Sequence, residues 1–246
     1  MQLRIPTEVC RSYIDCQSQR AETVAWDRRG HEALPVVTIS RQAGAGGFTL
    51  AQKLAQYLQE HDTRAACPWT VFDKELVQKV LEDHKLSGSV ARFMPEAKYS
   101  EIRDTVEELL GLHPARWTLA EKTSETILHL AQMGNAVVVG RGAAVIIGFV
   151  PNAFHVRLVG SVQQRIQRCE EYFQFNTEQA MEYVKQTDEG RVHYLKRHFN
   201  RSIDDPSLYH LVINTDAVTP EESVVIIGRL VLDRQETAKK SASTAG

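Results

Sequence analysis

Hydrophobic residues recur along the chain in two alternating patterns, short continuous runs and longer stretches at helical spacing. The short runs predict strands that are buried on both faces, as in a parallel sheet. They lie at 36–40, 69–72, 136–139, 154–159 and 210–215. The helical patterns lie between them, at about 50–60, 74–81, 102–110, 114–133, 162–169, 177–199 and 220–231. This alternation predicts an α/β protein whose five-stranded parallel sheet is wrapped by helices.

Two flanking segments lie outside the alternating pattern. Residues 1–34 are predicted to form an N-terminal helical extension, and residues 233–246 a polar, disordered tail. Between them, residues 35–232 are long enough for one domain with a sizeable core. The polar stretch 84–100 is expected to be a loop. Gly190 interrupts the long charged helix, which predicts that this helix is divided into two pieces.

The helix that follows Ser161 has a mixed surface. Its spacing predicts that Val162, Ile166 and Cys169 face the core. Arg165 and Arg168 are then expected elsewhere on its surface, so both are candidates for contact with a ligand.

Composition and charge exclude several classes of partner. The formal net charge of −2 provides no global basic field, so we expect no nucleic-acid partner. No stretch approaches about 18 consecutive apolar residues and the first residues lack a signal-peptide core, which predicts a cytoplasmic protein with no membrane partner. The four cysteines, Cys10, Cys16, Cys67 and Cys169, form no C-x-x-C pair and no zinc-finger spacing. They are expected to be reduced, incidental thiols.

A glycine-rich loop directly follows the first predicted strand. Gly44, Gly46 and Gly47 separate the run Val36–Ser40 from a helical pattern that begins near Leu50. A strand, a glycine loop and a helix N-terminus direct backbone N–H groups toward one point, which suits a phosphate. The general loop G-x-x-x-x-G-K-[ST] has a lysine after its last glycine, and this chain has none there. The pattern therefore predicts a phosphate site without its usual cation.

Further candidates follow other predicted strands, because ligands of such sheets bind at the carboxyl ends of the strands. Asp73 can cap the next helix, or hold a Mg²⁺-bound water or an acceptor group. Arg141 lies between two glycines that permit close backbone approach, so it is a candidate for an acceptor phosphate. Its alternative is a structural role, bonding loop carbonyls. The region around Ser161 is a third candidate.

Several segments together resemble the cytidylate kinase-like family, relatives of the nucleoside monophosphate kinases. The resemblance covers about residues 35–232, and it depends on the order and spacing of the motifs together. These motifs are Ile39–Gly47, Phe72–Val77, Val137–Gly142, Pro151–Leu158, Ser161, Arg165, Asp188, Arg191, Tyr194 and Tyr209–Thr215. The resemblance implies a P-loop kinase-like three-layer sandwich with helices on both faces of the sheet and a helical lid at about 165–205. It also implies ATP as donor, Mg²⁺ and a nucleotide-like acceptor.

The loop departs from the pattern of true cytidylate kinases at its charged position. They carry a lysine where this chain has Gly47, and the first glycine of their loop aligns with Arg41. Arg41 is the nearest replacement, because a guanidinium can bind phosphate in a bidentate way. Its alternative is a surface arginine paired with a carboxylate. Thr49 matches the position of the hydroxyl that binds Mg²⁺, or else bonds within the first helical turn.

These observations assign candidate roles. The residues expected to act in catalysis are Arg41, Arg141 and Arg191. Those expected to bind ATP are Gly44, Ala45, Gly46, Gly47, Phe48, Thr49 and Arg165, with Thr49 also as the Mg²⁺ ligand. Those expected to bind the acceptor are Asp73, Arg141 and Asp188. The rest of the basic group on the two lid helices, Arg168, Arg197 and Arg201, can extend this site or form a solvated face.

Three functions remain open on the sequence. The first is a nucleotide kinase that transfers a phosphoryl group from ATP to a nucleoside monophosphate, CMP-like, or to a similar small phosphorylated acceptor. The second is a nucleotide-binding regulatory module with weak or no catalysis. The third is a domain that uses its glycines only for packing. The acceptor and the oligomeric state are not readable, and a homodimer is compatible with the sequence.

Overall fold

The computed structural model describes residues 7–24, 34–65, 67–82 and 119–244. The loop predicted at 84–100 and the helix predicted at 102–110 lie outside these residues. The elements in chain order are α1 (Thr7–Val24), β1 (Val36–Arg41), α2 (Gly47–His61), β2 (Thr70–Phe72), α3 (Lys74–Glu82), α6 (Leu119–Met133), β3 (Ala136–Val139), α7 (Ala143–Ile146), β4 (Ala153–Val159), α8 (Val162–Phe173), α9 (Thr177–Phe199), the 3-10 helix η1 (Pro206–Leu208), β5 (Leu211–Asn214) and α10 (Pro220–Thr244).

The five strands form one parallel sheet in the order β2-β3-β1-β4-β5. β1 occupies the centre, where Val37 pairs with Val137 of β3 and with Phe154 of β4. Successive side chains of a strand point to opposite faces, so Val36 and Val37 pack into different apolar clusters. Both are fully buried, which explains why β1 reads as a continuous apolar run.

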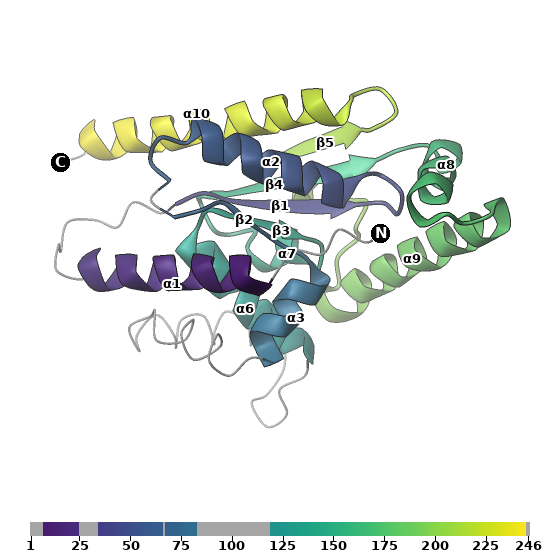
Figure 1. The fold of residues 1–246 in the computed structure, drawn as a ribbon, viewed down its shortest axis with the longest axis horizontal. Helices are drawn as coiled ribbons and strands as arrows, with labels where there is room; N and C mark the ends of the chain where they lie inside the picture. Colours follow the sequence, from purple (N-terminus) through teal and green to yellow (C-terminus); the bar gives the residue numbers. More distant parts are fainter. Residues whose placement is uncertain (1–6, 25–33, 66, 83–118, 245–246) are drawn as a thin grey trace.

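Helices cover both faces of the sheet, as Figure 1 shows. α2 and α10 lie on one face, where Leu54 and Ile227 join the apolar cluster. α1, α3, α6 and α7 lie on the other, with Tyr13, Ile127 and Ile146 in its cluster. Burial of apolar surface on both faces is the main driving force for this arrangement. The five-stranded parallel sheet between two layers of helices confirms the predicted fold class, a three-layer α/β sandwich.

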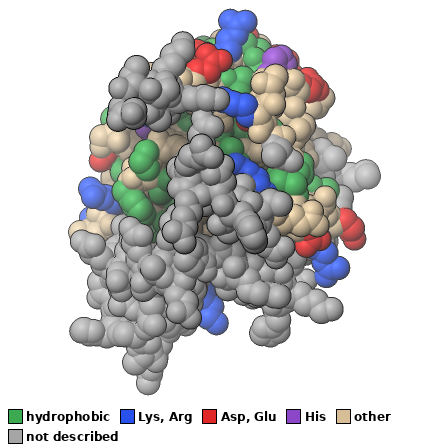
Figure 2. All heavy atoms as spheres, turned by 90° about the vertical axis from the view of Figure 1, so that its left-hand side faces the viewer, with side chains coloured by type: hydrophobic (Ala, Val, Ile, Leu, Met, Phe, Trp, Pro, Cys, Tyr) green, Lys and Arg blue, Asp and Glu red, His purple; other side chains and the backbone are tan. Residues whose placement is uncertain are grey.

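The two ends of the sheet differ. All strands run in the same direction, and the hairpin of α8 and α9 lies beyond the end of the sheet at which the strands have their carboxyl termini (Figure 1). Figure 2 shows the opposite end, where basic and acidic side chains of the described residues are interspersed. None of the helices in the described ranges is long and apolar enough to cross a membrane.

Two helices differ from the sequence predictions. α9 runs unbroken from Thr177 to Phe199, because a single glycine inside a helix costs only about 1 kcal/mol relative to alanine and does not have to interrupt it. α10 continues to Thr244, so the prediction of a disordered tail from residue 233 is wrong. The tail residues are mostly good helix formers without an interrupting glycine or proline, and Arg64 donates a hydrogen bond to Gln235 of this extension.

A disulfide joins Cys16 of α1 to Cys67, which precedes β2. The prediction that all four cysteines are reduced thiols is therefore wrong for this pair. Their sequence separation of 51 residues gave no signal, because only the packing of α1 against the domain brings them together. Closing a loop of this length restricts the unfolded chain and stabilises the folded state by an amount on the order of 4 kcal/mol. Cys10 and Cys169 are buried outside the disulfide.

A buried histidine predicts acid sensitivity. Nδ1 of His155 lies 2.8 Å from Oγ1 of Thr38, and Nε2 is buried without a hydrogen-bond partner among the described residues. Burial, aided by His210 and Arg234, lowers the pKa of His155 to about 4. Between about pH 6.5 and pH 4, His155 therefore binds a proton in the unfolded chain but not in the folded chain. The free energy of unfolding falls as the pH drops through this range. We expect a loss of about 2 kcal/mol between pH 7 and pH 5.

Urea unfolding at several pH values measures this slope. The uncharged variant His155→Gln should flatten it, whereas the exposed His193→Gln should not change it. An equal slope in the wild type and His155→Gln would show that another group is responsible.

Candidate functional site

The predicted phosphate loop lies at the centre of the sheet's carboxyl end. β1 pairs on both sides, which fixes Arg41 at the point where the loop begins. The chain then turns through Gly44 and Gly46, both at φ +73°, a conformation that a side chain would strain. Gly46 is the N-cap of α2, and no described side chain caps this helix. The first amide groups of α2 are thus available to a ligand, and the helix dipole favours an anion there.

The side chain of Arg41 crosses the loop. A Cβ atom added to Gly47 would lie 2.8 Å from Cγ of Arg41, and one added to Gly140 would collide with Nη1 of the same arginine. The aliphatic stem of Arg41 therefore lies against Gly47, and its guanidinium lies against Gly140, at the end of β3. Both glycines make room for this one side chain. A lysine at position 47 would displace the stem. The course of Arg41 over the loop therefore depends on glycine, and not lysine, at this position.

Arg141 is held in an unusual backbone conformation. Gly140, Arg141 and Gly142 all have positive φ, at +83°, +57° and +73°. A non-glycine residue in this region carries a conformational cost, and such residues concentrate at functional sites. The guanidinium groups of Arg41 and Arg141 form no hydrogen bond or ion pair with the described residues. The predicted alternative roles, a carboxylate partner for Arg41 or loop carbonyls for Arg141, are therefore not seen in this part of the chain.

Three arginines create a locally positive field. Desolvation, followed by repulsion from Arg191, lowers the pKa of Arg41 to about 9, although Asp73 opposes this shift. Burial also lowers the pKa of Arg141 and that of Arg191. Desolvation and repulsion both disfavour the charged forms, so an anion bound among them would raise all three pKa values and be held strongly in return. The electrostatics thus favour a polyanionic ligand.

Two cavities meet at these arginines. One, of about 580 Å³, lies over the glycine loop and extends to Arg168 and Tyr172 of α8. The other, of about 510 Å³, lies between the ends of β1 and β3 and helix α9, and it includes Lys74 and Arg141. Three residues line both cavities, namely Arg41, Tyr183 and Arg191. We name them the loop cavity and the second cavity.

The remaining loop residues and Asp73 have distinct places. Phe48 and Thr49 line the loop cavity from the first turn of α2, and Thr49 is exposed. One oxygen of Asp73 accepts a hydrogen bond from the Leu76 amide at 2.8 Å, so Asp73 caps α3. Lys53 is directed away from the site and pairs with Glu221 at 2.9 Å.

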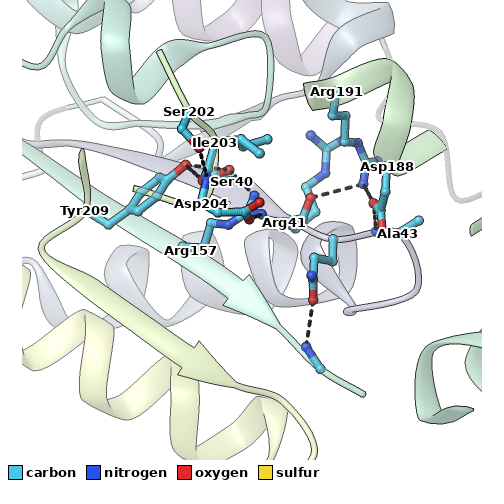
Figure 3. A network of polar contacts seen from close by, with 12 residues as sticks. Ser40, Arg41, Ala43, Arg157, Asp188, Arg191, Ser202, Ile203, Asp204 and Tyr209 are labelled. Carbon is cyan, nitrogen blue, oxygen red and sulfur yellow. Dashed lines mark hydrogen bonds and ion pairs between the residues drawn. The ribbon is translucent and has the colours of Figure 1, made fainter. Parts of the chain in front are cut away.

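Two predicted ligand residues contact the loop itself. Arg165 is buried, and its guanidinium donates to the carbonyl oxygens of Gly160 and Ala43, both at 3.0 Å. Asp188 accepts a hydrogen bond from the Ala43 amide at 2.7 Å (Figure 3). The expectation that Arg165 lies on the surface of its helix is wrong, and Val162, predicted to face the core, is exposed. Helix α8 therefore presents Arg165, and not Val162, to the protein interior. There the guanidinium satisfies carbonyl groups that would otherwise be buried without a donor.

Sequence reasoning missed several lining residues. Ser40 and Lys74 line the second cavity and adjoin predicted site residues, which is the signal that could have found them. Tyr209 comes from a distant segment, with its hydroxyl 3.3 Å from Oγ of Ser40; it belongs to the motifs of the family resemblance, but no role in the site was predicted for it. Of the wider basic group, Arg168 donates to the Thr215 carbonyl oxygen at 2.8 Å beside the loop cavity. Arg197 and Arg201 are exposed, as on a solvated face.

Comparison with solved structures shows the same fold elsewhere. An uncharacterized protein from Eubacterium ventriosum superposes with a TM-score of 0.64 and 20% identity, covering 81% of this chain and 98% of that chain. A shikimate kinase from Bacteroides thetaiotaomicron also matches, over 80% of this chain and 98% of that chain. Its TM-score of 0.36 and 13% identity are too low to support any argument about function.

Comparisons of sequence give one match. The model of the cytidylate kinase-like family matches residues 36–217, which extends from the first residue of β1 to the turn after β5. It therefore includes the glycine loop, the whole second cavity, most of the loop cavity and the α8–α9 hairpin. No curated protein matches the chain significantly.

Proposed function

The chain belongs to the cytidylate kinase-like family, and from this premise we propose that it transfers a phosphoryl group from ATP to a nucleoside monophosphate or a similar small phosphorylated acceptor. The observation that carries this proposal is the course of Arg41. Its guanidinium lies between a phosphate-loop cavity and a second basic cavity, and it lines both. Phosphoryl transfer requires a cation at that junction, where charge on the transferred group must be neutralised.

ATP is assigned to the loop cavity. The open amide groups of Gly47, Phe48 and Thr49 can donate to its phosphates, and Arg168 with Tyr172 lies at the other end of the cavity, where the base would reach. Arg165 then supports the loop from behind. This arrangement places the triphosphate next to Arg41 and Arg191.

The described residues fit Mg²⁺ only together with phosphate. No group of three His, Cys, Asp or Glu side chains in these ranges could hold a metal ion. Thr49 lines the loop cavity at the start of a helix whose amides suit phosphate, so Thr49 is the residue that would hold the ion beside ATP. When bound, Mg²⁺ neutralises phosphate charge.

The acceptor is assigned to the second cavity. Arg141 and Lys74, which both line this cavity, supply positive charge for its phosphate. Asp73 does not itself line this cavity but directly precedes Lys74, which does; only one of its oxygens caps α3, so the other is left for a polar group of the acceptor. Arg41 and Arg191, between the cavities, then hold the phosphoryl group as it passes from donor to acceptor. Because Arg41, Arg141 and Arg191 are only partly exposed, solvent screens their charges less than those of fully exposed side chains.

A nucleotide panel tests the proposal. We expect ATP with Mg²⁺ to raise the melting temperature, since a ligand at about 100 times its Kd adds about 2.7 kcal/mol of stability. Nucleoside monophosphates that also raise it are then assayed for phosphorylation with labelled ATP. ATP binding without transfer to any acceptor would support the binding module instead, and absence of any nucleotide effect would support glycines used only for packing.

A further inference from the structure

The α8–α9 hairpin is joined to the phosphate loop at one residue, Ala43. Its amide donates to Oδ1 of Asp188 at 2.7 Å, and its carbonyl oxygen accepts from Nη1 of Arg165 at 3.0 Å. The same Nη1 donates to Oδ2 of Asp188 at 2.6 Å. The two side chains and the Ala43 backbone thus form a closed ring of hydrogen bonds. We call this ring the Ala43 clamp.

Packing around the clamp leaves the loop little freedom. The methyl group of Ala43 is buried in a small apolar cluster with Cys169 of α8 and with Ala180 and Val184 of α9. A Cβ atom added to Gly44 would collide with the backbone carbonyl oxygen of Arg165. Helix α8 therefore lies directly against the loop, and no side chain fits between them.

The clamp also positions the arginine that faces both cavities. Nη1 of Arg191 donates to the backbone carbonyl oxygen of Arg41 at 3.1 Å and lies 3.5 Å from Oδ1 of Asp188 (Figure 3). One nitrogen of Arg191 is held in this way by the start of the loop and by the clamp. Its remaining nitrogens are left for the cavities that it lines.

We propose that Asp188 is a positioning residue, which fixes the phosphate loop through the Ala43 amide and holds Arg165 and Arg191 against it. The proposal rests on the loop being the phosphate site described above. It replaces the expectation that Asp188 contacts the acceptor, because both of its oxygens already accept hydrogen bonds from the loop and from Arg165. The hairpin is thereby a fixed wall of the loop cavity, and the shape of the loop depends on it.

The chemistry of the clamp gives a sharp variant. A carboxylate has two acceptor oxygens, whereas the amide of asparagine has one acceptor and one donor. Asp188→Asn has nearly the same shape, but it can satisfy only one of the two donors, the Ala43 amide or Arg165. Its exposed neighbour on α9 provides the matched control, Glu189→Gln, which removes one carboxylate charge from the same helix.

Hydrogen exchange of the free protein tests the clamp without any nucleotide. In Asp188→Asn we expect the exchange rate of the Ala43 amide to rise at least tenfold, while amides of the buried strand β3 keep their wild-type rates. Glu189→Gln should leave all of these rates unchanged. If Asp188→Asn does not fold, the smaller change Arg165→Lys, which keeps the charge but loses the fork of donors, should raise the same rate. An unchanged Ala43 rate in the folded variant overturns the proposal.

Kinetics distinguish positioning from acceptor contact. A positioning role predicts that Asp188→Asn weakens ATP binding about tenfold and lowers kcat, with little change in the KM of the acceptor. An increase in the acceptor KM alone, with a wild-type Kd for ATP, contradicts the proposal. If the wild-type chain binds no nucleotide, the proposed function fails, whereas the exchange rate of Ala43 still decides whether Asp188 holds the loop.

Discussion

Replacement of Arg41 by alanine is expected to lower kcat/KM for phosphoryl transfer by about 10²- to 10³-fold, or roughly 3–4 kcal/mol of transition-state stabilisation. Arg41 lines both cavities and its guanidinium forms no hydrogen bond or ion pair with the described residues, so no structural partner loses a side-chain bond when it is removed. Its loss should therefore affect the reaction far more than the fold. Steady-state kinetics with the best acceptor of the nucleotide panel measure the effect.

Two further variants make the Arg41 prediction specific. Arg41→Lys keeps the charge but loses the bidentate fork, so its activity should lie between those of the wild type and the alanine variant. Lys53→Ala removes a cation from α2 that pairs with Glu221 on the surface, and it should behave as the wild type. Equal activity of Arg41→Ala and Lys53→Ala would refute the catalytic role of Arg41.

The sheet and most helices could be predicted from sequence because their signals are local. The continuous apolar run of β1 arises because both faces of this strand are buried, and the spacing of Leu50 and Leu54 arises from one buried face of α2. The glycine loop was found for the same reason, since Gly44 and Gly46 adopt the positive φ that a strand-to-helix turn requires. Similarly, the capping role of Asp73 depends only on the start of the next helix.

The roles of several charged residues could not be predicted because they depend on contacts between distant segments. Arg165 was expected on a surface, yet it is buried because a loop carbonyl 122 residues away needs a donor. Cys16 and Cys67 were expected to be thiols, yet the packing of α1 brings them into a disulfide. Tyr209 was not predicted as a site residue, although its hydroxyl contacts Ser40 across 169 residues. Spacing along the chain carries no information about such pairs.

The position of the loop cation yields the second large effect. In the wild-type background, Gly47→Lys should lower kcat/KM by about 10²-fold or more, because a Cβ atom there would lie 2.8 Å from Cγ of Arg41 and would displace its stem. The new lysine adds a positive charge, yet it moves the guanidinium of Arg41 away from its position between the two cavities. The melting temperature should be affected less than the activity, since the glycine loop lies at the edge of the apolar core.

The double variant Arg41→Ala/Gly47→Lys separates collision from loss of a role. Without the Arg41 stem, the lysine has room to extend over the loop toward the same phosphates, so the double variant should recover at least tenfold of the activity that Arg41→Ala loses. The same lysine would then be harmful beside Arg41 and beneficial without it, a reversal of sign that only two residues sharing one space and one function can produce. Additive losses in the double variant would show that Gly47 is needed for the loop itself, and that Arg41 does not stand in for the lysine.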